Sequence, residues 1–344
     1  MALDERLKWA CDKALKTLDL LAGQRILVAG DFLLDRYVIG RSTRLSREAP
    51  VVVLEHESGR TNLGGAGNAT RNVLALGGEP VPLGLVGEDR EGDEVVELLR
   101  AGGIDTHGIL RDPERPTVTK TRILAGAANT ARQQVLRIDK GEEYGSSQIE
   151  RLNRRARSLL GDVGAVLFSD YGYSTLAPPV RSCLIQVART RNIPSCADSR
   201  YRLTEYRGVT VATPNEEEAG AVLGRALRND ADVTSAGREL LSRLSARAVV
   251  LTRGNLGMRV LEGTGFFRDI PPARKGEVAD VTGAGDTVAS ALVLALAAGS
   301  DILSAAVLAN TAASVVVGRR GATTAVPEEV ARALEAWRSS SEWT

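Results

Sequence analysis

Residues 280–287 read Asp-Val-Thr-Gly-Ala-Gly-Asp-Thr and stand directly before an apolar run that ends near Ala298. Glycines weaken a helix, so their presence where a helix begins indicates a backbone that must approach another group closely. The free N–H groups of a first turn at Gly283–Asp286 would form an anion site. An aspartate held there favours its ionised form, so Asp286 could accept a proton from a bound hydroxyl. A helix-capping carboxylate explains Asp286 equally well, and the residues alone leave both interpretations open.

A second glycine-rich stretch, at residues 62–72, contains two asparagines and also precedes a predicted helix. Small residues with asparagines can bind a polyol through backbone N–H and side-chain amide groups. A plain glycine-rich turn explains the same residues, and from this stretch alone it is the simpler interpretation. Neither glycine cluster matches the phosphate-binding GxxxxGK[ST] pattern or the dinucleotide-binding GxGxxG pattern, which disfavours P-loop enzymes and Rossmann dehydrogenases.

A third stretch, Thr-Pro-Asn-Glu-Glu-Glu-Ala at 213–219, follows a predicted strand. Asn215 and Glu218 are three residues apart, so they share one face of a starting helix. Oxygen groups so placed suit Mg²⁺, which keeps several waters and binds through one or two protein groups. The competing interpretation, an N-cap followed by an acidic first turn, is the more common use of such a sequence.

Composition excludes several classes of function. The chain of 344 residues has a net charge of +1 and only 4% aromatic residues. We therefore expect no basic surface that would bind nucleic acid or an anionic membrane, and no aromatic surface that would stack with bases. With only two histidines, His56 and His107, a zinc site or a Ser-His-Asp triad is disfavoured.

The N-terminal segment and the thiols predict a cytoplasmic protein without a membrane span. Residues 1–24 mix charges and contain no signal-like apolar core, and their apolar residues fall on one helical face, which predicts an amphipathic helix packed on the body. The apolar run at 288–298 is too short to span a bilayer. Three separated cysteines are typical of reduced thiols, and two of them, Cys183 and Cys196, are expected to be buried.

The order of predicted elements indicates an α/β fold. From residue 25 strands alternate with helices, which is typical of a mostly parallel sheet covered on both faces. Strand-only pieces around 36–55 and 115–139 interrupt the alternation. We expect these two insertions to pair into a small β-sheet lid beside a main domain that covers 25–338.

Together these stretches resemble the PfkB (ribokinase-like) carbohydrate kinases, and the similarity runs from about Arg25 to Thr324. Gly64-Gly65-x-x-Asn68, Asn215-x-x-Glu218 and residues 280–286 are similar, in the same order, to the two signatures and the metal motif of that family. The resemblance implies a three-layer α/β/α fold and transfer of a phosphoryl group from ATP, with Mg²⁺, to a sugar hydroxyl.

The resemblance also implies roles for individual residues. Asp286 would be the catalytic base, and Gly283, Ala284 and Gly285 would form the anion hole. Sugar hydroxyls and a sugar-borne phosphate would be bound by Asp35, Arg44, Gly65, Asn68, Lys120, Arg122 and Asp170. ATP would be bound by Asn215, Thr252, Gly254, Gly257 and Asn310, with the metal and its water shell organised by Asn215 and Glu218. Such an arrangement is chemically coherent, because phosphoryl transfer needs positioning and charge neutralisation.

Within the family, the segments at 30–37, 42–54, 117–124, 133–139, 168–174 and 310–324 are similar to those of kinases acting on D-glycero-D-manno-heptose 7-phosphate. That similarity implies phosphorylation of the anomeric hydroxyl. One segment differs: residues 198–203 read Asp-Ser-Arg-Tyr-Arg-Leu where the heptose kinases have an Asp-Pro-Lys type of sequence. This segment is closer to ketodeoxygluconate and fructose kinases, so fructose, ribose or 2-keto-3-deoxygluconate remain alternative substrates. A non-catalytic sugar-binding protein on the same fold is the third alternative.

Three further expectations follow from the resemblance. Some heptose kinases carry a nucleotidyltransferase domain with an H-x-G-H motif; this sequence has none, so we expect only the kinase step. The alternating apolar residues at 47–55 predict that two lids join in a homodimer, although the same residues would equally suit packing on their own domain. A monovalent cation near Asp280 is common among relatives, and the sequence leaves it open.

Overall fold

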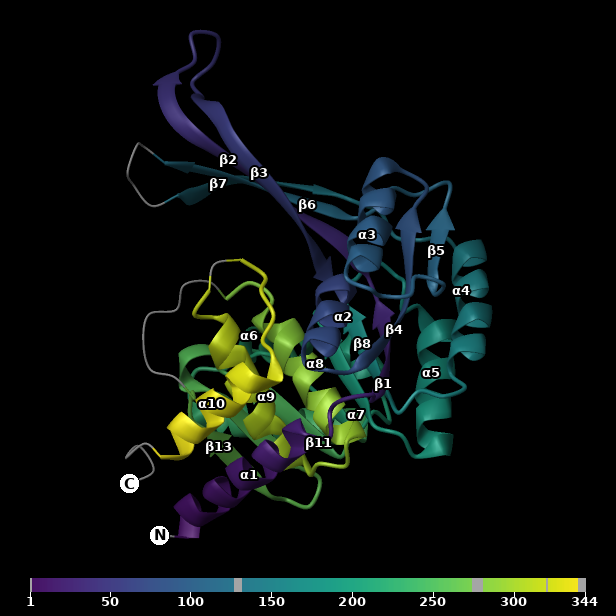
Figure 1. Ribbon diagram of the computed structural model, residues 1–344, viewed down its shortest axis with the longest axis vertical. Coiled ribbons are helices and arrows are strands. Elements are labelled where there is room, and N and C mark those ends of the chain that lie inside the picture. The colour runs from purple at the N-terminus through teal and green to yellow at the C-terminus, as the bar shows by residue number, and fades with distance from the viewer. Residues whose placement is uncertain (1, 127–131, 274–280, 320, 340–344) are drawn as a thin grey trace.

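The computed structural model describes residues 2–126, 132–273, 281–319 and 321–339. Its centre is a nine-stranded sheet with helices on both faces, and a separate four-stranded sheet projects from one side (Figure 1). Across the large sheet the strands are β13 (Phe267–Ile270), β12 (Met258–Glu262), β11 (Ala248–Thr252), β10 (Val211–Ala212), β9 (Ser195–Ser199), β8 (Ala165–Asp170), β1 (Arg25–Gly30), β4 (Glu79–Gly87) and β5 (Ile109–Asp112). All pairs are parallel except those at the edge formed by β11, β12 and β13.

Successive strand residues point to opposite faces of this sheet, and each face has its own core. In β1, Ile26 and Val28 join one cluster of buried side chains, whereas Leu27 and Ala29 join the other. The first face is covered by α1 (Ala2–Leu18), α2 (Ala66–Ala75), α3 (Arg90–Ala101), α8 (Ala284–Ala297), α9 (Ile302–Val316) and α10 (Pro327–Arg338). The second face is covered by α4 (Ser146–Leu159), α5 (Pro178–Arg191), α6 (Glu216–Leu223) and α7 (Asp230–Leu244), with the short turns η1 (Leu203–Glu205) and η2 (Gly254–Leu256) in connecting loops. The predicted three-layer α/β/α fold is confirmed.

Helix α8 is apolar on nearly all sides because it is an interior helix. Every residue from Asp286 to Leu296 is buried, and α8 packs against both α2 and α9. A helix that is hydrophobic all round must lie in a core or a membrane. No helix in the described part of the chain has the length and apolarity needed to cross a membrane.

Helix α1 packs against α9 and α10 through the apolar face that the sequence predicts. Leu7, Ala10, Ala14 and Leu18 are buried, and Cys11 lies among them. Arg338 at the end of α10 pairs with Asp12 at 2.7 Å. All three cysteines are buried and free, including the expected Cys183 and Cys196.

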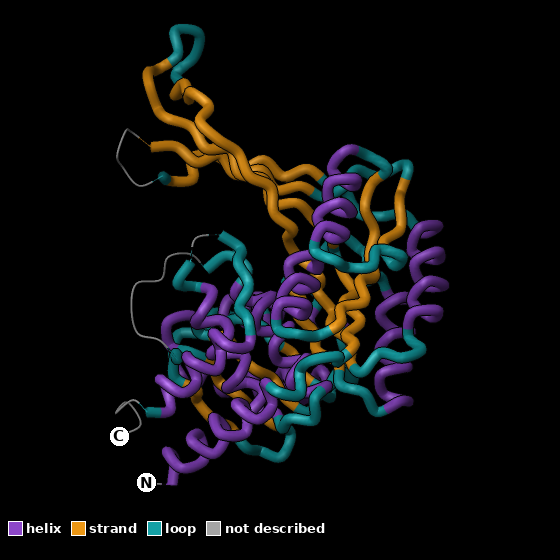
Figure 2. Tube along the Cα trace, in the orientation of Figure 1, coloured by secondary structure: helices purple, strands orange, loops and turns teal. Residues whose placement is uncertain are grey.

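The four-stranded sheet, which we call the lid, has the strand order β3-β2-β6-β7 and extends away from the body (Figures 1 and 2). Its strands are β2 (Phe32–Leu45), β3 (Val52–Gly65), β6 (Thr119–Gly126) and β7 (Gln133–Lys140). The prediction of a lid from two distant insertions is confirmed, although β2 and β3 are longer than the extended pieces expected within 36–55. They form one long antiparallel hairpin that begins inside the core and ends in solvent.

The pairing of the lid strands sets which side chains face the body. Cross-strand partners share a face of a sheet, and Asp35 pairs with Lys120, which pairs with Asp139. In the next row with the same orientation, Tyr37 pairs with Arg122, which pairs with Arg137. The lid therefore presents charged residues to the body.

Candidate active site

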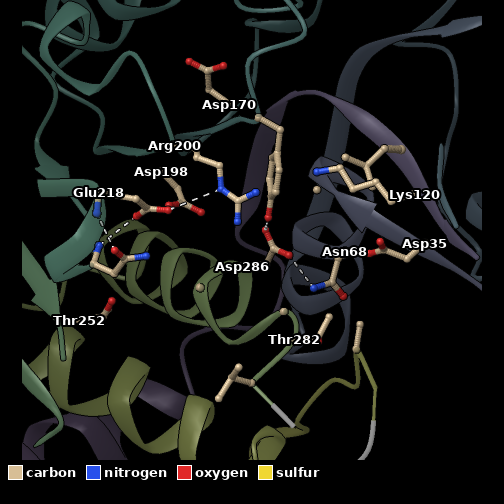
Figure 3. A pocket seen from close by; sticks show the side chains of 18 of the residues that line it. Asp35, Asn68, Lys120, Asp170, Asp198, Arg200, Glu218, Thr252, Thr282 and Asp286 are labelled. Carbon is tan, nitrogen blue, oxygen red and sulfur yellow. Dashed lines mark hydrogen bonds and ion pairs between the residues drawn. The ribbon is translucent and has the colours of Figure 1, made fainter. Parts of the chain in front are cut away.

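The site lies at the carboxyl edge of the parallel strands, beneath the near end of the lid. Strand β1 is flanked by β4 and β8, so the chain winds away from β1 in both directions and leaves a crevice there. A cavity of about 530 Å³ opens along this edge. Figure 3 shows the side chains that line it, which come from the lid, from α2 and α8, and from the loops after β8, β9, β10 and β11.

Asp286, in the first turn of α8, is the buried carboxylate at the centre of this cavity. Only 4% of its surface is exposed. Its Oδ2 accepts a hydrogen bond from Asn68 Nδ2 at 2.8 Å, and its Oδ1 accepts one from the Tyr171 hydroxyl at 3.1 Å. Burial raises the pKa of Asp286 to about 7, and these two hydrogen bonds oppose that rise. A carboxylate so adjusted is suited to general-base work near neutral pH.

The two glycine-rich stretches are neighbours in space, and their contact explains why the glycines are needed. Gly283 has φ +82°, and a Cβ placed on it would lie 2.6 Å from Asn68 Nδ2. Thr287 donates to Asn72 Oδ1 at 2.9 Å, which ties α8 to α2. Gly283 thus lets the start of α8 press against α2, so that Asn68 and Asp286 meet.

The lid side of the cavity carries Lys120, Arg122 and Asp35. Arg122 forms an ion pair with Asp35 and is therefore already neutralised. Lys120 is only 7% exposed, and within the described residues its ammonium group has no carboxylate partner. It lies instead over the ring of Tyr171, at 5.2 Å from the ring centre. Burial, followed by the charge of Arg200, lowers the pKa of Lys120, so a bound anion would be favourable there.

The opposite side carries Asp198, Arg200 and Glu218 (Figure 3). Burial, together with the charges of Glu218 and Asp286, raises the pKa of Asp198 well above its usual range. Burial also raises the pKa of Glu218. Arg200 Nε lies 3.9 Å from Glu218 Oε1. A bound cation would stabilise the ionised forms of these carboxyl groups.

Asn215 and Glu218 form a capping box at the start of α6, which is the structural alternative that the sequence left open. Asn215 Oδ1 accepts from the Glu218 N–H at 2.7 Å, and Glu218 Oε2 accepts from the Asn215 N–H at 3.0 Å. Both side chains still line the cavity. The Asn215 amide nitrogen and Glu218 Oε1 take no part in these two capping bonds.

The sequence of this chain is similar to those of known proteins. Residues 24–329 match the model of the "pfkB family carbohydrate kinase". The chain belongs to the pfkB family. Membership places it among the carbohydrate kinases, as the sequence motifs predict.

Relatives of this pfkB kinase support the assignment. The chain is 41% identical over 319 residues to the "Bifunctional protein HldE" of Methylococcus capsulatus, and the match covers 92% of this chain and 65% of that protein. It is 39% identical to the protein of the same name from Geobacter metallireducens, with 92% and 64% covered. The chain thus spans slightly less than two thirds of the length of these relatives.

Solved structures share the fold. An Arabidopsis thaliana ribokinase "complexed with Ribose and ATP" superimposes with a TM-score of 0.70 at 18% identity, and the match covers 91% of this chain and 99% of that chain. The phosphofructokinase-2 of Escherichia coli "in complex with Potassium" has a TM-score of 0.73 at 17% identity, with 92% and 99% covered.

Most of the site residues predicted for the pfkB kinase lie together in the cavity. Its lining includes Asp35, Gly65, Asn68, Lys120, Arg122, Asp170, Asn215, Glu218, Thr252, Gly254, Gly283, Gly285 and Asp286. Asp170 is nonetheless turned to the protein, because its carboxylate accepts hydrogen bonds from Ser199 and Tyr206. We infer that Asp170 supports the loop rather than the sugar.

Four predicted residues do not line this cavity in the part of the chain that the structure describes. Arg44 is exposed near the far end of β2, and Ala284 is not part of the cavity surface. Gly257 lies against Ile270 and Pro271, and Asn310 donates to the Pro271 carbonyl at 2.9 Å. The roles of these residues remain predictions, and Asp280 lies outside the described residues.

Sequence reasoning assigned no role to Tyr171, Asp198 or Arg137, although all three line the cavity. Tyr171 directly follows β8 and Asp198 lies near the end of β9, so both are at the carboxyl edge of the sheet. Their position after predicted strands could have indicated them from the sequence. Arg137 reaches the cavity only because β7 pairs with β6. Only the strand pairing, which is a long-range property, reveals it.

Proposed function

We propose that this kinase phosphorylates a hydroxyl of a sugar that already carries a phosphate, with D-glycero-D-manno-heptose 7-phosphate as the substrate and its anomeric hydroxyl as the acceptor. The carrying observation is the pair formed by Asp286 and Lys120, which are a buried carboxylate with a raised pKa and a buried ammonium group without a carboxylate partner. The heptose assignment is supported by the sequence segments described above.

Different residues would bind the sugar, remove the proton and stabilise the transferring phosphoryl group. Asn68 and Asp35 would hold sugar hydroxyls; Asn68 Oδ1 is buried and has no hydrogen-bond partner among the described residues. Asp286 would take the proton of the acceptor hydroxyl as its oxygen forms a bond to the terminal phosphorus of ATP and the bond from that phosphorus to the bridging oxygen breaks, so that ADP leaves. Backbone N–H groups of the first turn of α8 would then face the charge that develops on the transferring phosphoryl group.

The other end of the cavity would bind the ATP phosphates. Arg200, the Asn215 amide and the turn at Thr252–Gly254 all lie on that side. The carboxylates of Asp198 and Glu218 fit a divalent cation, and Glu218 Oε1 would hold Mg²⁺ together with water. Mg²⁺ would neutralise phosphate charge there. No group of three or more metal-ligating side chains occurs among the described residues, which agrees with an ion bound largely by water and phosphate.

The phosphate on the acceptor is the part of the proposal that Lys120 supports. The carboxylates of Asp35 and Asp139 on the neighbouring strands attract the Lys120 ammonium group, but burial and the charge of Arg200 outweigh them, and an anionic substrate would offset the remaining cost. Arg137 lines the same side of the cavity and would add a second positive charge. Arg122 contributes less than the sequence suggests, because Asp35 already neutralises it.

A second candidate function keeps the reaction and changes the sugar. Asp198 and Arg200 occupy the segment that resembles ketodeoxygluconate and fructose kinases, and the structure has both lining the cavity. Under this alternative Arg200 would contact the substrate and the acceptor would carry no phosphate.

The test is a comparison of kcat/KM for ATP-dependent turnover across phosphorylated and unphosphorylated sugars. We expect heptose 7-phosphate to exceed fructose, ribose and 2-keto-3-deoxygluconate. Preference for an unphosphorylated sugar would favour the second candidate. Binding of ATP and sugar without turnover would instead indicate the non-catalytic alternative.

We also propose a homodimer formed through the lid, no nucleic-acid or membrane partner, and a cytoplasmic location. Exposed apolar side chains on the lid support the dimer, and the three buried free cysteines support a reducing compartment. Dependence on a monovalent cation is left to a comparison of activity in potassium, sodium and choline salts.

A further inference from the structure

Tyr171 occupies a position that the proposed reaction does not yet use. Its hydroxyl donates to Asp286 Oδ1 at 3.1 Å, while Asn68 donates to the other oxygen at 2.8 Å. The carboxylate of the base is therefore held at both oxygens by neutral donors. Each oxygen keeps a second lone pair, so a sugar hydroxyl can bind without removing either donor.

The loop that carries Tyr171 is fixed by a second buried carboxylate. Asp31, directly after β1, is 2% exposed, and its Oδ2 accepts from the backbone N–H groups of Tyr171 at 2.8 Å and Tyr173 at 3.2 Å. On the other side, Asp170 accepts from the Gly172 N–H at 3.0 Å. This anchoring leaves the Tyr171 backbone little freedom, so its hydroxyl is presented to Asp286 from a rigid support.

The ring of Tyr171 contacts two cations. Lys120 Nζ lies 5.2 Å and the Arg200 guanidinium carbon 5.6 Å from the ring centre. Figure 3 shows these two cations extending toward Asp286 from two sides. A change that keeps the ring and removes only the hydroxyl will therefore preserve both cation contacts and isolate the hydrogen bond.

We propose that Tyr171 is a positioning residue for the base: its hydroxyl holds the Asp286 carboxylate in the orientation and the ionised state that proton removal requires. This inference rests on the proposed kinase function, because it assumes that Asp286 is the base. It adds a role for a residue that lies outside the glycine-rich motifs.

The direction of the expected effect follows from the groups that face Asp286. Asp35 on β2 disfavours its ionised form, and Arg200 in the loop after β9 favours it. Asp198 on β9 also faces this site, and its own pKa is raised well above the usual range by burial and by the charges of Glu218 and Asp286. Asn68 on α2 and the Tyr171 hydroxyl stabilise the ionised form by hydrogen bonds. Loss of the Tyr171 hydroxyl therefore raises the pKa of Asp286, so that less of the base is ionised at a given acidic pH.

The experiment measures kcat/KM from pH 5.5 to 9.5 for the natural chain and for Tyr171→Phe. We expect the acidic limb to move up by roughly one pH unit, which is a loss of about tenfold near pH 6 and little loss at pH 9. The matched control, Tyr173→Phe, removes a hydroxyl from the same loop that is not bonded to Asp286, and its acidic limb should not move.

Two outcomes would overturn the inference. A loss of the same size at every pH would show that the hydroxyl has a structural role only. An unmoved acidic limb, with or without a lower KM for the sugar, would show that the hydroxyl does not maintain the ionised base.

A second measurement does not depend on turnover. The titration of the Asp286 carboxyl group can be followed by infrared difference spectra between the natural chain and Asp286→Asn, and between Tyr171→Phe and the corresponding double variant. We expect a higher midpoint in the Tyr171→Phe background, and equal midpoints would contradict the inference. If the natural chain phosphorylates no sugar, the proposed function fails, whereas this titration still decides whether Tyr171 governs the state of Asp286.

Discussion

At the scale of single residues, the site combines groups whose burial is unfavourable for folding. Asp286 is a carboxyl group with 4% exposure, and Lys120 is an ammonium group with 7% exposure. Neither forms an ion pair with the other or with another described residue, so both carry a desolvation penalty. Such a penalty is expected where charge is needed for binding or catalysis rather than for stability.

Asp286→Asn should therefore stabilise the protein while it removes activity. The pKa of Asp286 is raised on folding, so the folded state retains a proton that the unfolded chain releases, and stability falls as pH rises from about 4 to about 7. We expect turnover to fall by about 10²–10⁴-fold and the Tm at pH 8 to rise by roughly 3–8 °C. Thermal unfolding at pH 4 is the internal control, since the carboxyl group is protonated there and the gain should disappear. A variant with near-normal turnover would remove the base assignment.

Lys120→Met tests the anion site. Loss of one charge-assisted contact should raise the KM for a phosphorylated sugar by roughly 10–100-fold and leave the KM for an unphosphorylated sugar nearly unchanged. Lys140→Met is the matched control, because Lys140 lies on the same lid but pairs with Glu91 at 3.1 Å. Equal losses for both classes of sugar would argue against a phosphate at Lys120.

At the scale of elements, the start of α8 is shaped by its contact with α2. Gly283 has φ +82° and no room for a Cβ, whereas Gly285 has an ordinary helical conformation and no atom of a described residue within 4 Å of its Cβ position. The first glycine is thus required by the fold. No described residue accounts for the second, and we expect a bound phosphoryl group to come close to it.

This difference predicts opposite effects for two alanine substitutions. Gly283→Ala should destabilise the protein by about 1–3 kcal/mol, because it strains the backbone and displaces Asn68. Gly285→Ala should leave stability unchanged or raise it by about 0.5–1 kcal/mol, yet lower kcat/KM by obstructing the phosphoryl group. Urea unfolding and kinetics on both variants measure this. Full activity in Gly285→Ala would show that no phosphate approaches this turn.

At the scale of the whole molecule, the lid has two chemically different faces. Most of the residues paired across β2, β6 and β7 on the face toward the cavity are charged, while Leu136 and Ile138 point the other way, because Arg137 between them lines the cavity. Both apolar side chains are 53% exposed on an edge strand. An apolar edge of this kind favours pairing with another chain.

The proposed dimer can be tested by replacing Leu136 and Ile138 together with glutamate. Sedimentation or light scattering should show a dimer for the natural chain and a monomer for the double variant. Leu20→Glu serves as the control, since Leu20 is 56% exposed on the body and not on the lid. A natural chain that is already monomeric at micromolar concentration would exclude the lid dimer.

Local residue patterns determined much of this protein. The alternation of strands and helices, the amphipathic first helix, the start of α8 at the glycine turn and the family motifs are all properties of short stretches, in which neighbours along the chain decide the conformation. The helix expected to start at Gly283–Asp286 and to continue to about Ala298 was therefore placed to within a residue or so of α8. The capping box of Asn215 and Glu218 was foreseen as an alternative for the same reason.

Only the tertiary structure decided which groups are paired and which remain without a partner. Arg122 and Lys120 look equivalent in the sequence. The strand register places Lys120 directly opposite Asp35, yet it is Arg122, one row further along the lid, that forms the ion pair with Asp35, while Lys120 lies over the ring of Tyr171. Tyr171 itself reaches Asp286 across 115 positions of the chain. The physical reason is that the pKa of a buried group and the strength of a hydrogen bond depend on neighbours in space, and those neighbours come from strands and helices that are distant in the sequence.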